Sequence, residues 1–240
     1  MERALGRIVR GIPPQSPESL LAEMDTHGIS QTVVLALPTW GDNRGLLKSC
    51  QGKPRLIPFI SLIPGSEPEP QMDELLAAGG RGVKVHPALQ GIVVDGEFCK
   101  RVLGHAGKKN VPVLIHAGGS GRMLGLSTGK AQDPQAFRRL ANSAPHASLV
   151  VAHSGLWEYP EVLAAVRNCP NVWLDISFQH PIVLRELHDA VGAERMILGS
   201  DFPVGRVDLV LKNLAVAGFS EKNIARIVWE NAGKLLRSSR

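Results

Sequence analysis

The chain has 240 residues, of which 44% are hydrophobic and 20% charged, which is typical of a globular protein with a sizeable core. This length fits one α/β barrel, so we expect a single domain over residues 1–240. The net charge of +5 is mild, and no basic stripe with interleaved aromatic residues indicates a nucleic-acid partner.

The apolar runs and the cysteines narrow the class of protein further. No apolar run approaches the length of a membrane span, and the N-terminal residues lack the apolar segment of a secretory signal. The three cysteines, Cys50, Cys99 and Cys169, are far apart and odd in number, which does not fit a disulfide framework. We therefore expect a cytoplasmic protein without a membrane or nucleic-acid partner.

Apolar runs of strand length alternate with helical stretches along the chain. A helix is predicted first, because Ser16 can cap it and Pro17 fits its first turn. Strands are predicted to begin at Thr32, Leu56, Gly82, Val111, Leu149, Val172 and Met196. Helices are predicted over 17–28, 44–50, 70–78, 97–109, 134–144, 159–167, 182–191, 207–217 and 220–236. This alternation is typical of a parallel sheet with helices outside it.

The number of predicted strands is one short of a closed barrel. A TIM barrel has eight parallel strands, whereas this sequence offers seven runs. Residues 3–15 contain only Ile8 and Val9 as an apolar pair, which is a poor match to a buried strand. The predicted fold is therefore α/β, a (β/α)₈ TIM-barrel-like domain that is incomplete, with seven strands.

Four of the predicted strands end on ionisable residues. These residues are Lys84, His86, His116, His153 and Asp201. In a barrel of this class the catalytic groups lie at the carboxyl ends of the strands. We therefore expect the five residues, here called the mouth cluster, to line one opening of the barrel.

The mouth cluster contains the donors of a metal site. Neutral imidazole suits zinc and related metals, and a carboxylate completes such sites, so His116, His153 and Asp201 are candidate ligands of one divalent ion. Asp201 could instead cap the next helix, and His86 could instead bond its own loop. A buried ammonium needs an anion, so Lys84 is expected to face Asp201, a substrate carboxylate or a carbamate formed on its own amine.

Two further segments are less specific. Residues 118–130 contain five glycines and no periodicity, so we expect a long loop at the mouth, which could act as a lid or cradle an anion. Asp175 lies in the sixth predicted strand beside Trp173, and the alternation leaves open which way its side chain points.

From about Gln31 onward the chain resembles the amidohydrolase superfamily, and most closely its amidohydrolase-related branch of barrel hydrolases and decarboxylases. The matching pieces are Gly82–Pro87, Pro112–His116, Val151–Gly155, Gly199–Pro203 and Glu230–Ala232. The resemblance implies that His116 and Asp201 bind a metal, expected to be zinc, and that His153 is a second ligand or orients the attacking water. It also implies that Asp201 takes the proton from that water. From their position and chemistry, Lys84 and His86 are expected to bind the substrate.

The chain departs from this family at the first strand. The family carries His-x-His there, and no His-x-His occurs in this sequence. We therefore expect the chain to begin just after that strand and to bind metal weakly. Two exposed sheet edges would then allow self-association into a homo-oligomer.

The resemblance implies a metal-dependent hydrolase that cleaves an ester, lactone or amide bond of a small carboxylate-bearing substrate. One alternative is a metal-dependent decarboxylase of an aromatic or unsaturated acid. Another is a catalytically impaired barrel that only binds a small acid or a partner.

Overall fold

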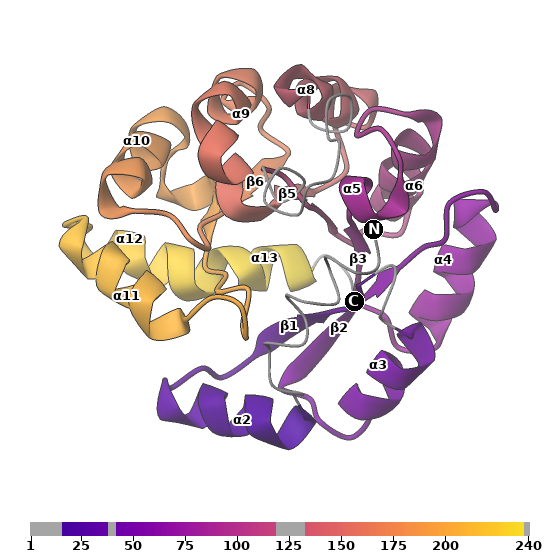
Figure 1. Ribbon diagram of the computed structural model, residues 1–240, viewed down its shortest axis with the longest axis horizontal. Helices are drawn as coiled ribbons and strands as arrows, with labels where there is room; N and C mark the ends of the chain where they lie inside the picture. The colour runs from indigo at the N-terminus through magenta and orange to yellow at the C-terminus, as the bar shows by residue number, and fades with distance from the viewer. Residues whose placement is uncertain (1–15, 38–41, 119–132, 238–240) are drawn as a thin grey trace, which may run out of the picture.

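The computed structural model describes residues 16–37, 42–118 and 133–237, which form one curled parallel sheet with helices around it (Figure 1). The strands are β1 (Thr32–Leu35), β2 (Leu56–Ser61), β3 (Gly82–Val85), β4 (Val113–Ile115), β5 (Leu149–Val151), β6 (Val172–Asp175) and β7 (Met196–Ile197). Each strand pairs in parallel with the next one in the chain. All seven predicted strands are confirmed, although β4 begins two residues later than predicted, beyond Pro112, which has no N–H to donate.

The predicted helices are also found, most of them within two residues of their expected ends. They are α2 (Pro17–Thr26), α3 (Asn43–Cys50), α4 (Pro68–Ala77), α6 (Glu97–Lys108), α8 (Pro134–Ser143), α9 (Tyr159–Val166), α10 (Pro181–Val191) and α11 (Val207–Val216). The helix predicted over 220–236 is divided into α12 (Glu221–Ala225), a π turn (Arg226–Glu230) and α13 (Asn231–Arg237). The structure adds α5 (Pro87–Gln90), a single turn directly after β3.

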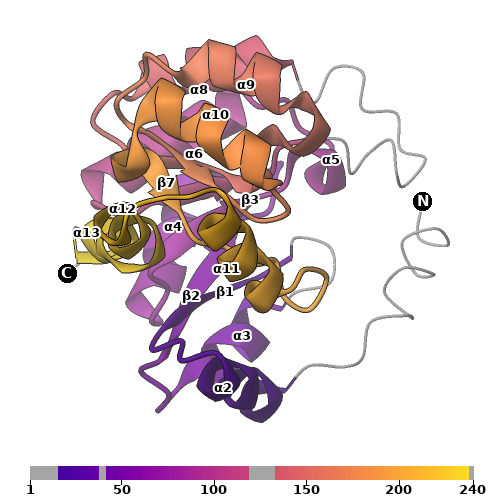
Figure 2. The same cartoon turned by 90° about the vertical axis from the view of Figure 1, so that its left-hand side faces the viewer.

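The outer face of the sheet carries the main core. Val85, Ile115, Val151 and Leu174 follow one another across the paired strands, and each is at most 1% exposed. They pack with apolar side chains of the surrounding helices. In Figure 2, α8, α9 and α10 lie at the top of the molecule and α2 and α3 at the bottom, with the curled sheet between them. Burial of these apolar side chains is the main force that holds the helices to the sheet.

The inner face carries a smaller apolar cluster and, beyond it, the mouth cluster. Inward-facing residues of four strands pack with two residues of α13; the set is Leu114, Val150, Trp173, Ile197, Ala232 and Leu235. Figure 2 places α13 at the opposite end of the molecule from α5, which follows the carboxyl end of β3. Helix α13 therefore covers the amino-terminal part of the inner face and leaves its carboxyl-terminal part to the polar residues.

The sheet is open along one side. Within the described part of the chain, β1 pairs only with β2, and β7 pairs only with β6, so the incomplete seven-stranded barrel is confirmed. Residues 3–15, and nearly all of the loop predicted over 118–130, lie outside the described residues. Among the helices that the structure describes, none is long and apolar enough to span a membrane.

Candidate active site

The structure brings the mouth cluster together at the carboxyl ends of the strands. The rings of His86 and His116 stack with centroids 3.9 Å apart, and the ring of His153 meets that of His116 edge-on at 5.1 Å. Lys84 is buried, and the carboxylate of Asp201 acts electrostatically on both Lys84 and His153. The five predicted residues thus share one end of the sheet, while their chemical roles stay predictions.

His153 follows β5 in an unusual stretch of backbone. The four residues His153–Leu156 all have positive φ, between 48° and 93°. Left-handed conformations cost free energy in residues that carry a Cβ, and they concentrate at functional sites. Asp175 accepts a hydrogen bond from His153 N at 2.8 Å, Ser154 Oγ donates to Asp175 O at 2.7 Å, and Gln179 Nε2 donates to His153 O. Strand β6 and the turn after it therefore hold His153 in place.

A buried chain of hydrogen bonds fixes the tautomer of His153. Ser177 Oγ lies 2.6 Å from Asp175 Oδ2 and 2.6 Å from His153 Nδ1. The hydroxyl has one proton and an ionised carboxylate can only accept, so Ser177 donates to Asp175 and accepts from His153. His153 therefore carries its proton on Nδ1, and its Nε2 keeps a lone pair that can accept a hydrogen bond.

Sequence reasoning does not single out Ser177 and leaves the direction of Asp175 open. The signal is nevertheless present, because both residues stand at the end of a predicted strand, two positions apart, and so share one face. The structure turns Asp175 inward. Gly199 on the neighbouring chain segment makes room for it, because a Cβ at that position would overlap Asp175 Oδ1.

Burial decides the charge of the basic residues in the mouth cluster. Burial lowers the pKa of Lys84 to about 8, although Asp201 and Asp175 favour its charged form. Burial and the neighbouring Lys84 charge lower the pKa of His86 to about 3. Burial likewise lowers the pKa of His116, and the nearby His86 and Lys84 lower it further. Burial also lowers the pKa of His153, although the carboxylates of Asp175 and Asp201 act in the opposite direction. At neutral pH the cluster contains one ammonium and three neutral imidazoles.

Asp201 is the carboxylate of the mouth cluster. As a whole residue it is exposed, yet its carboxylate is surrounded closely enough for burial to raise its pKa, against the attraction of His153 and Lys84. Its backbone has a φ of 55°, again in the left-handed region. A carboxylate with a raised pKa is a better proton acceptor than a fully solvated one.

His86 has a second role in the fold. It is the N-cap of α5, and its Nδ1 accepts a long hydrogen bond of 3.4 Å from Leu89 N. The alternative that His86 bonds its own loop is therefore observed, and the residue still lies against His116 in the mouth cluster. Because His86 is neutral and its Nδ1 is an acceptor, its proton sits on Nε2.

The contacts of these side chains do not fit a preformed metal centre. Within the described ranges, no three side chains of His, Cys, Asp or Glu come together closely enough to hold a metal ion. Imidazole lone pairs lie in the ring plane, so the stacked rings of His86 and His116, inclined by only 7°, do not aim at one point, and His86 does not join His116 as a further ligand. The assignment of His116, His153 and Asp201 as metal ligands stays a prediction that this arrangement does not support.

Comparisons with known proteins agree with the fold. A family model described as Amidohydrolase matches residues 7–238. No curated protein matches the chain. An uncharacterised TIM-barrel protein from Bordetella bronchiseptica superposes with a TM-score of 0.79 at 19% identity, over 92% of this chain and 83% of that one.

Two further solved structures are similar to this chain and have described activities. A protein described as a 2-pyrone-4,6-dicarboxylic acid hydrolase from Pseudomonas putida gives a TM-score of 0.70 at 20% identity, over 93% of this chain and 88% of that one. The 2,6-dihydroxybenzoate decarboxylase from Rhizobium gives a TM-score of 0.72 at 17% identity, over 96% of this chain and 91% of that one. At these identities the likeness shows a shared fold.

Proposed function

Because the chain belongs to the amidohydrolase family, we propose that its mouth cluster binds a small carboxylate-bearing substrate and hydrolyses an ester, lactone or amide bond in it. The observation that carries this proposal is the buried ammonium of Lys84. Among the described residues no carboxylate lies within the 4.0 Å of an ion pair with it, although it is only 3% exposed. A buried charge needs a counter-charge, and a substrate carboxylate would supply one.

The printed names of the structural neighbours support this substrate class. One neighbour is described as acting on a 2-pyrone dicarboxylic acid and another on a dihydroxybenzoate. Both compounds are small, planar and carry at least one carboxylate. An ammonium beside stacked imidazole rings suits such acids, because flat rings pack well on flat rings.

We assign separate roles in hydrolysis to residues of the mouth cluster. His153 Nε2 accepts a hydrogen bond from the attacking water and orients it, while Asp201 takes the proton as the water oxygen bonds to the carbonyl carbon. His86 Nε2–H is the donor available to the negative charge on the former carbonyl oxygen, while Lys84 stays paired with the substrate carboxylate. Collapse of the tetrahedral intermediate breaks the bond to the leaving oxygen or nitrogen, which takes the proton back from Asp201.

A divalent ion, expected to be zinc, is the cofactor that the family resemblance implies. Bound water on such an ion has a pKa near 7. The proposed steps assign no ligand role to His116, His153 or Asp201, because no three His, Cys, Asp or Glu side chains of the described residues come together closely enough to hold an ion.

Decarboxylation is the second candidate, and the dihydroxybenzoate decarboxylase among the neighbours favours it. In that reaction the bond between the carboxylate and its carbon breaks, carbon dioxide leaves, and the carbon takes a proton from an acid of the site. The same carboxylate-binding lysine would then hold the group that is lost.

The test is to supply purified protein with a pyrone dicarboxylate and, separately, with a hydroxybenzoate, each with and without added zinc. Hydrolysis is followed by loss of the pyrone absorbance, and decarboxylation by release of carbon dioxide. Ring opening supports the proposal, and carbon dioxide release alone replaces it with the second candidate. Binding of both acids without turnover would identify a barrel that only binds small acids.

A further inference from the structure

Ser61 lies beside Lys84 on the inner face of the sheet. It is the last residue of β2 and the register partner of Lys84 in β3. Register partners on neighbouring parallel strands point to the same face, and Lys84 faces the mouth, where Asp201 and Asp175 attract it. Ser61 and Lys84 are 4% and 3% exposed, so both are deeply buried.

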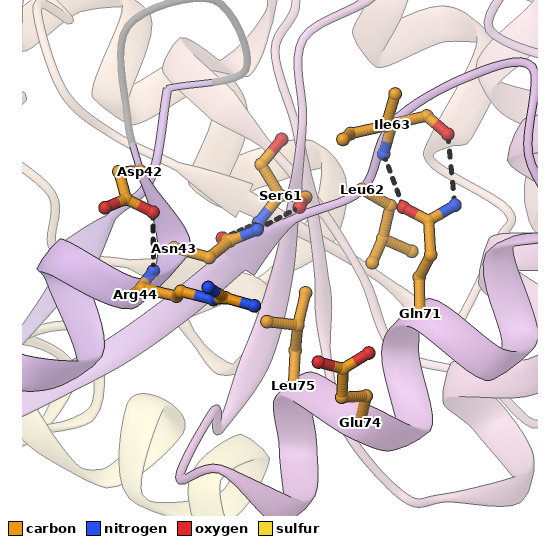
Figure 3. Close-up of a pocket in the computed structure, with 9 residues that line it drawn as sticks. All are labelled: Asp42, Asn43, Arg44, Ser61, Leu62, Ile63, Gln71, Glu74 and Leu75. Carbon is orange, nitrogen blue, oxygen red and sulfur yellow. Dashed lines mark hydrogen bonds between the residues drawn. The ribbon is translucent and has the colours of Figure 1, made fainter.

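The backbone of Ser61 is fixed, but its hydroxyl has no partner. Asn43 at the start of α3 donates to Ser61 O at 2.7 Å and accepts from Ser61 N at 2.9 Å (Figure 3). Ser61 Oγ is one of three buried side-chain atoms in the described part of the chain that make no hydrogen bond. Leaving a buried hydroxyl unpaired costs free energy, so such an atom in a folded protein calls for an explanation.

The cavity drawn in Figure 3 does not supply that explanation. It has a volume of about 340 Å³ and is lined by residues of α3 and α4 and by the end of β2. Ser61 is among the lining residues, but the polar partners nearest to its chain segment are occupied: Asp42 accepts from Arg44 N, and Gln71 bonds both backbone groups of Ile63. The unpaired Ser61 hydroxyl lies instead on the inner face, where Ser61 is the register partner of Lys84.

We propose that Ser61 and Lys84 together form a carboxylate subsite, in which the Ser61 hydroxyl donates a hydrogen bond to the same carboxylate that pairs with Lys84. This inference rests on the proposed function, because it concerns the binding of that substrate. A carboxylate has two acceptor oxygens, one for each donor, and no proton to oppose the ammonium. A carboxamide of the same shape is neutral, so it forms no ion pair with Lys84, and its hydrogen bond to the Ser61 hydroxyl is not charge-assisted.

The test measures binding rather than turnover, so that its failure differs from failure of the proposed function. Benzoate, benzamide and inorganic phosphate are titrated into the full-length protein and followed by calorimetry. We expect the wild-type protein to bind benzoate in preference to both other probes. Ser61→Ala should weaken benzoate binding about tenfold, the effect of losing one charge-assisted hydrogen bond, and should weaken benzamide binding clearly less, because its hydrogen bond to the hydroxyl is neutral.

Two further variants guard against a simple loss of folding. Ser61→Thr keeps the hydroxyl and should keep benzoate binding, whereas Ser61→Cys has nearly the same shape and a weak donor and should behave like Ser61→Ala. Thermal unfolding of each variant reports whether the fold is intact. Lys84→Met should lose benzoate binding altogether.

Several results would overturn the inference. Equal benzoate affinity in the wild type, Ser61→Ala and Ser61→Cys proteins would show that the hydroxyl takes no part. Equal weakening of benzoate and benzamide would give Ser61 a purely structural role, and tighter binding of phosphate than of benzoate would replace the carboxylate by a phosphate. No benzoate binding by the wild-type protein would remove the subsite. Absence of hydrolysis with intact benzoate binding would instead remove only the proposed function.

Discussion

His86 and His116 lie face to face, with their ring centroids 3.9 Å apart and their planes inclined by 7°. Both rings are buried and both pKa values are lowered, so the contact is a stack of neutral imidazoles. Protonation of either ring would place a positive charge against the other ring and close to Lys84. The stack therefore depends on a pH at which both rings stay neutral.

Acid should destabilise the protein through this stack. The pKa of His86 is lowered to about 3 in the folded protein, whereas an unfolded histidine has a pKa of about 6.5. Between these values the unfolded chain binds more protons than the folded one, so stability rises with pH and is lost on acidification. We expect the free energy of unfolding to fall steadily from about pH 6.5 towards pH 4, as measured by urea titration at each pH. His86→Phe should flatten this slope, and His146→Gln, at an exposed histidine, should not.

Alkali should weaken the binding of carboxylates. The pKa of Lys84 is lowered to about 8 by burial, so the free site loses its positive charge as the pH rises through that value. We expect benzoate affinity, measured by calorimetry, to be constant below about pH 7 and to fall about tenfold per pH unit well above pH 8. Lys84→Arg keeps its charge at these pH values and should remove the fall, and an unchanged profile in that variant would exclude Lys84 as the titrating group.

Asp201→Asn should abolish hydrolysis with little change in folding. The amide keeps the shape of the side chain but cannot accept a proton, and loss of a general base typically reduces the rate about 10²–10⁴-fold. Benzoate binding should be retained or strengthened, because a carboxylate that competes for Lys84 is removed. Asp208→Asn on α11 is the matched control, since that carboxylate pairs with Arg206 at the surface. Turnover near the wild-type rate in Asp201→Asn would remove Asp201 from the mechanism.

Ser177→Ala should release the tautomer of His153. The hydroxyl connects Asp175 to His153 Nδ1 through two hydrogen bonds of 2.6 Å, and it is the reason that the proton sits on Nδ1. We expect the ¹⁵N shifts of the His153 ring to show a protonated Nδ1 in the wild type and a mixture of tautomers in the variant. Ser177→Thr restores the hydroxyl and should restore the wild-type pattern. A wild-type ring protonated on Nε2 would contradict the assignment.

Removal of metal should leave the fold and the binding of carboxylates intact. Within the described ranges no three His, Cys, Asp or Glu side chains are close enough to hold one ion, so we expect purified protein to contain well below one equivalent of zinc. After treatment with a chelator, the melting temperature and the benzoate affinity should be unchanged. One equivalent of zinc that survives dialysis in the wild type and is lost in His116→Gln would establish the predicted metal site instead.

The sequence by itself determines the strands, nearly all of the helices and the meeting of Lys84, His86, His116, His153 and Asp201 at one end of the sheet. The physical reason is that these features depend on local patterns. Buried parallel strands are continuous apolar runs, caps and prolines mark helix starts, and the carboxyl ends of parallel strands lie at the same edge.

The contacts between those side chains are decided only by the tertiary structure. The period of two along a strand fixes which residues share a face, but not how close they lie to residues of other strands. The inward turn of Asp175 depends on the space that Gly199 leaves for it. The left-handed backbone at His153 is held by the hydrogen bond from its N–H to Asp175 of β6. The unpaired hydroxyl of Ser61 lies beside Lys84 because β2 and β3 pair in this register. Each of these depends on residues more than 20 positions apart in the chain, and only packing in three dimensions brings them together.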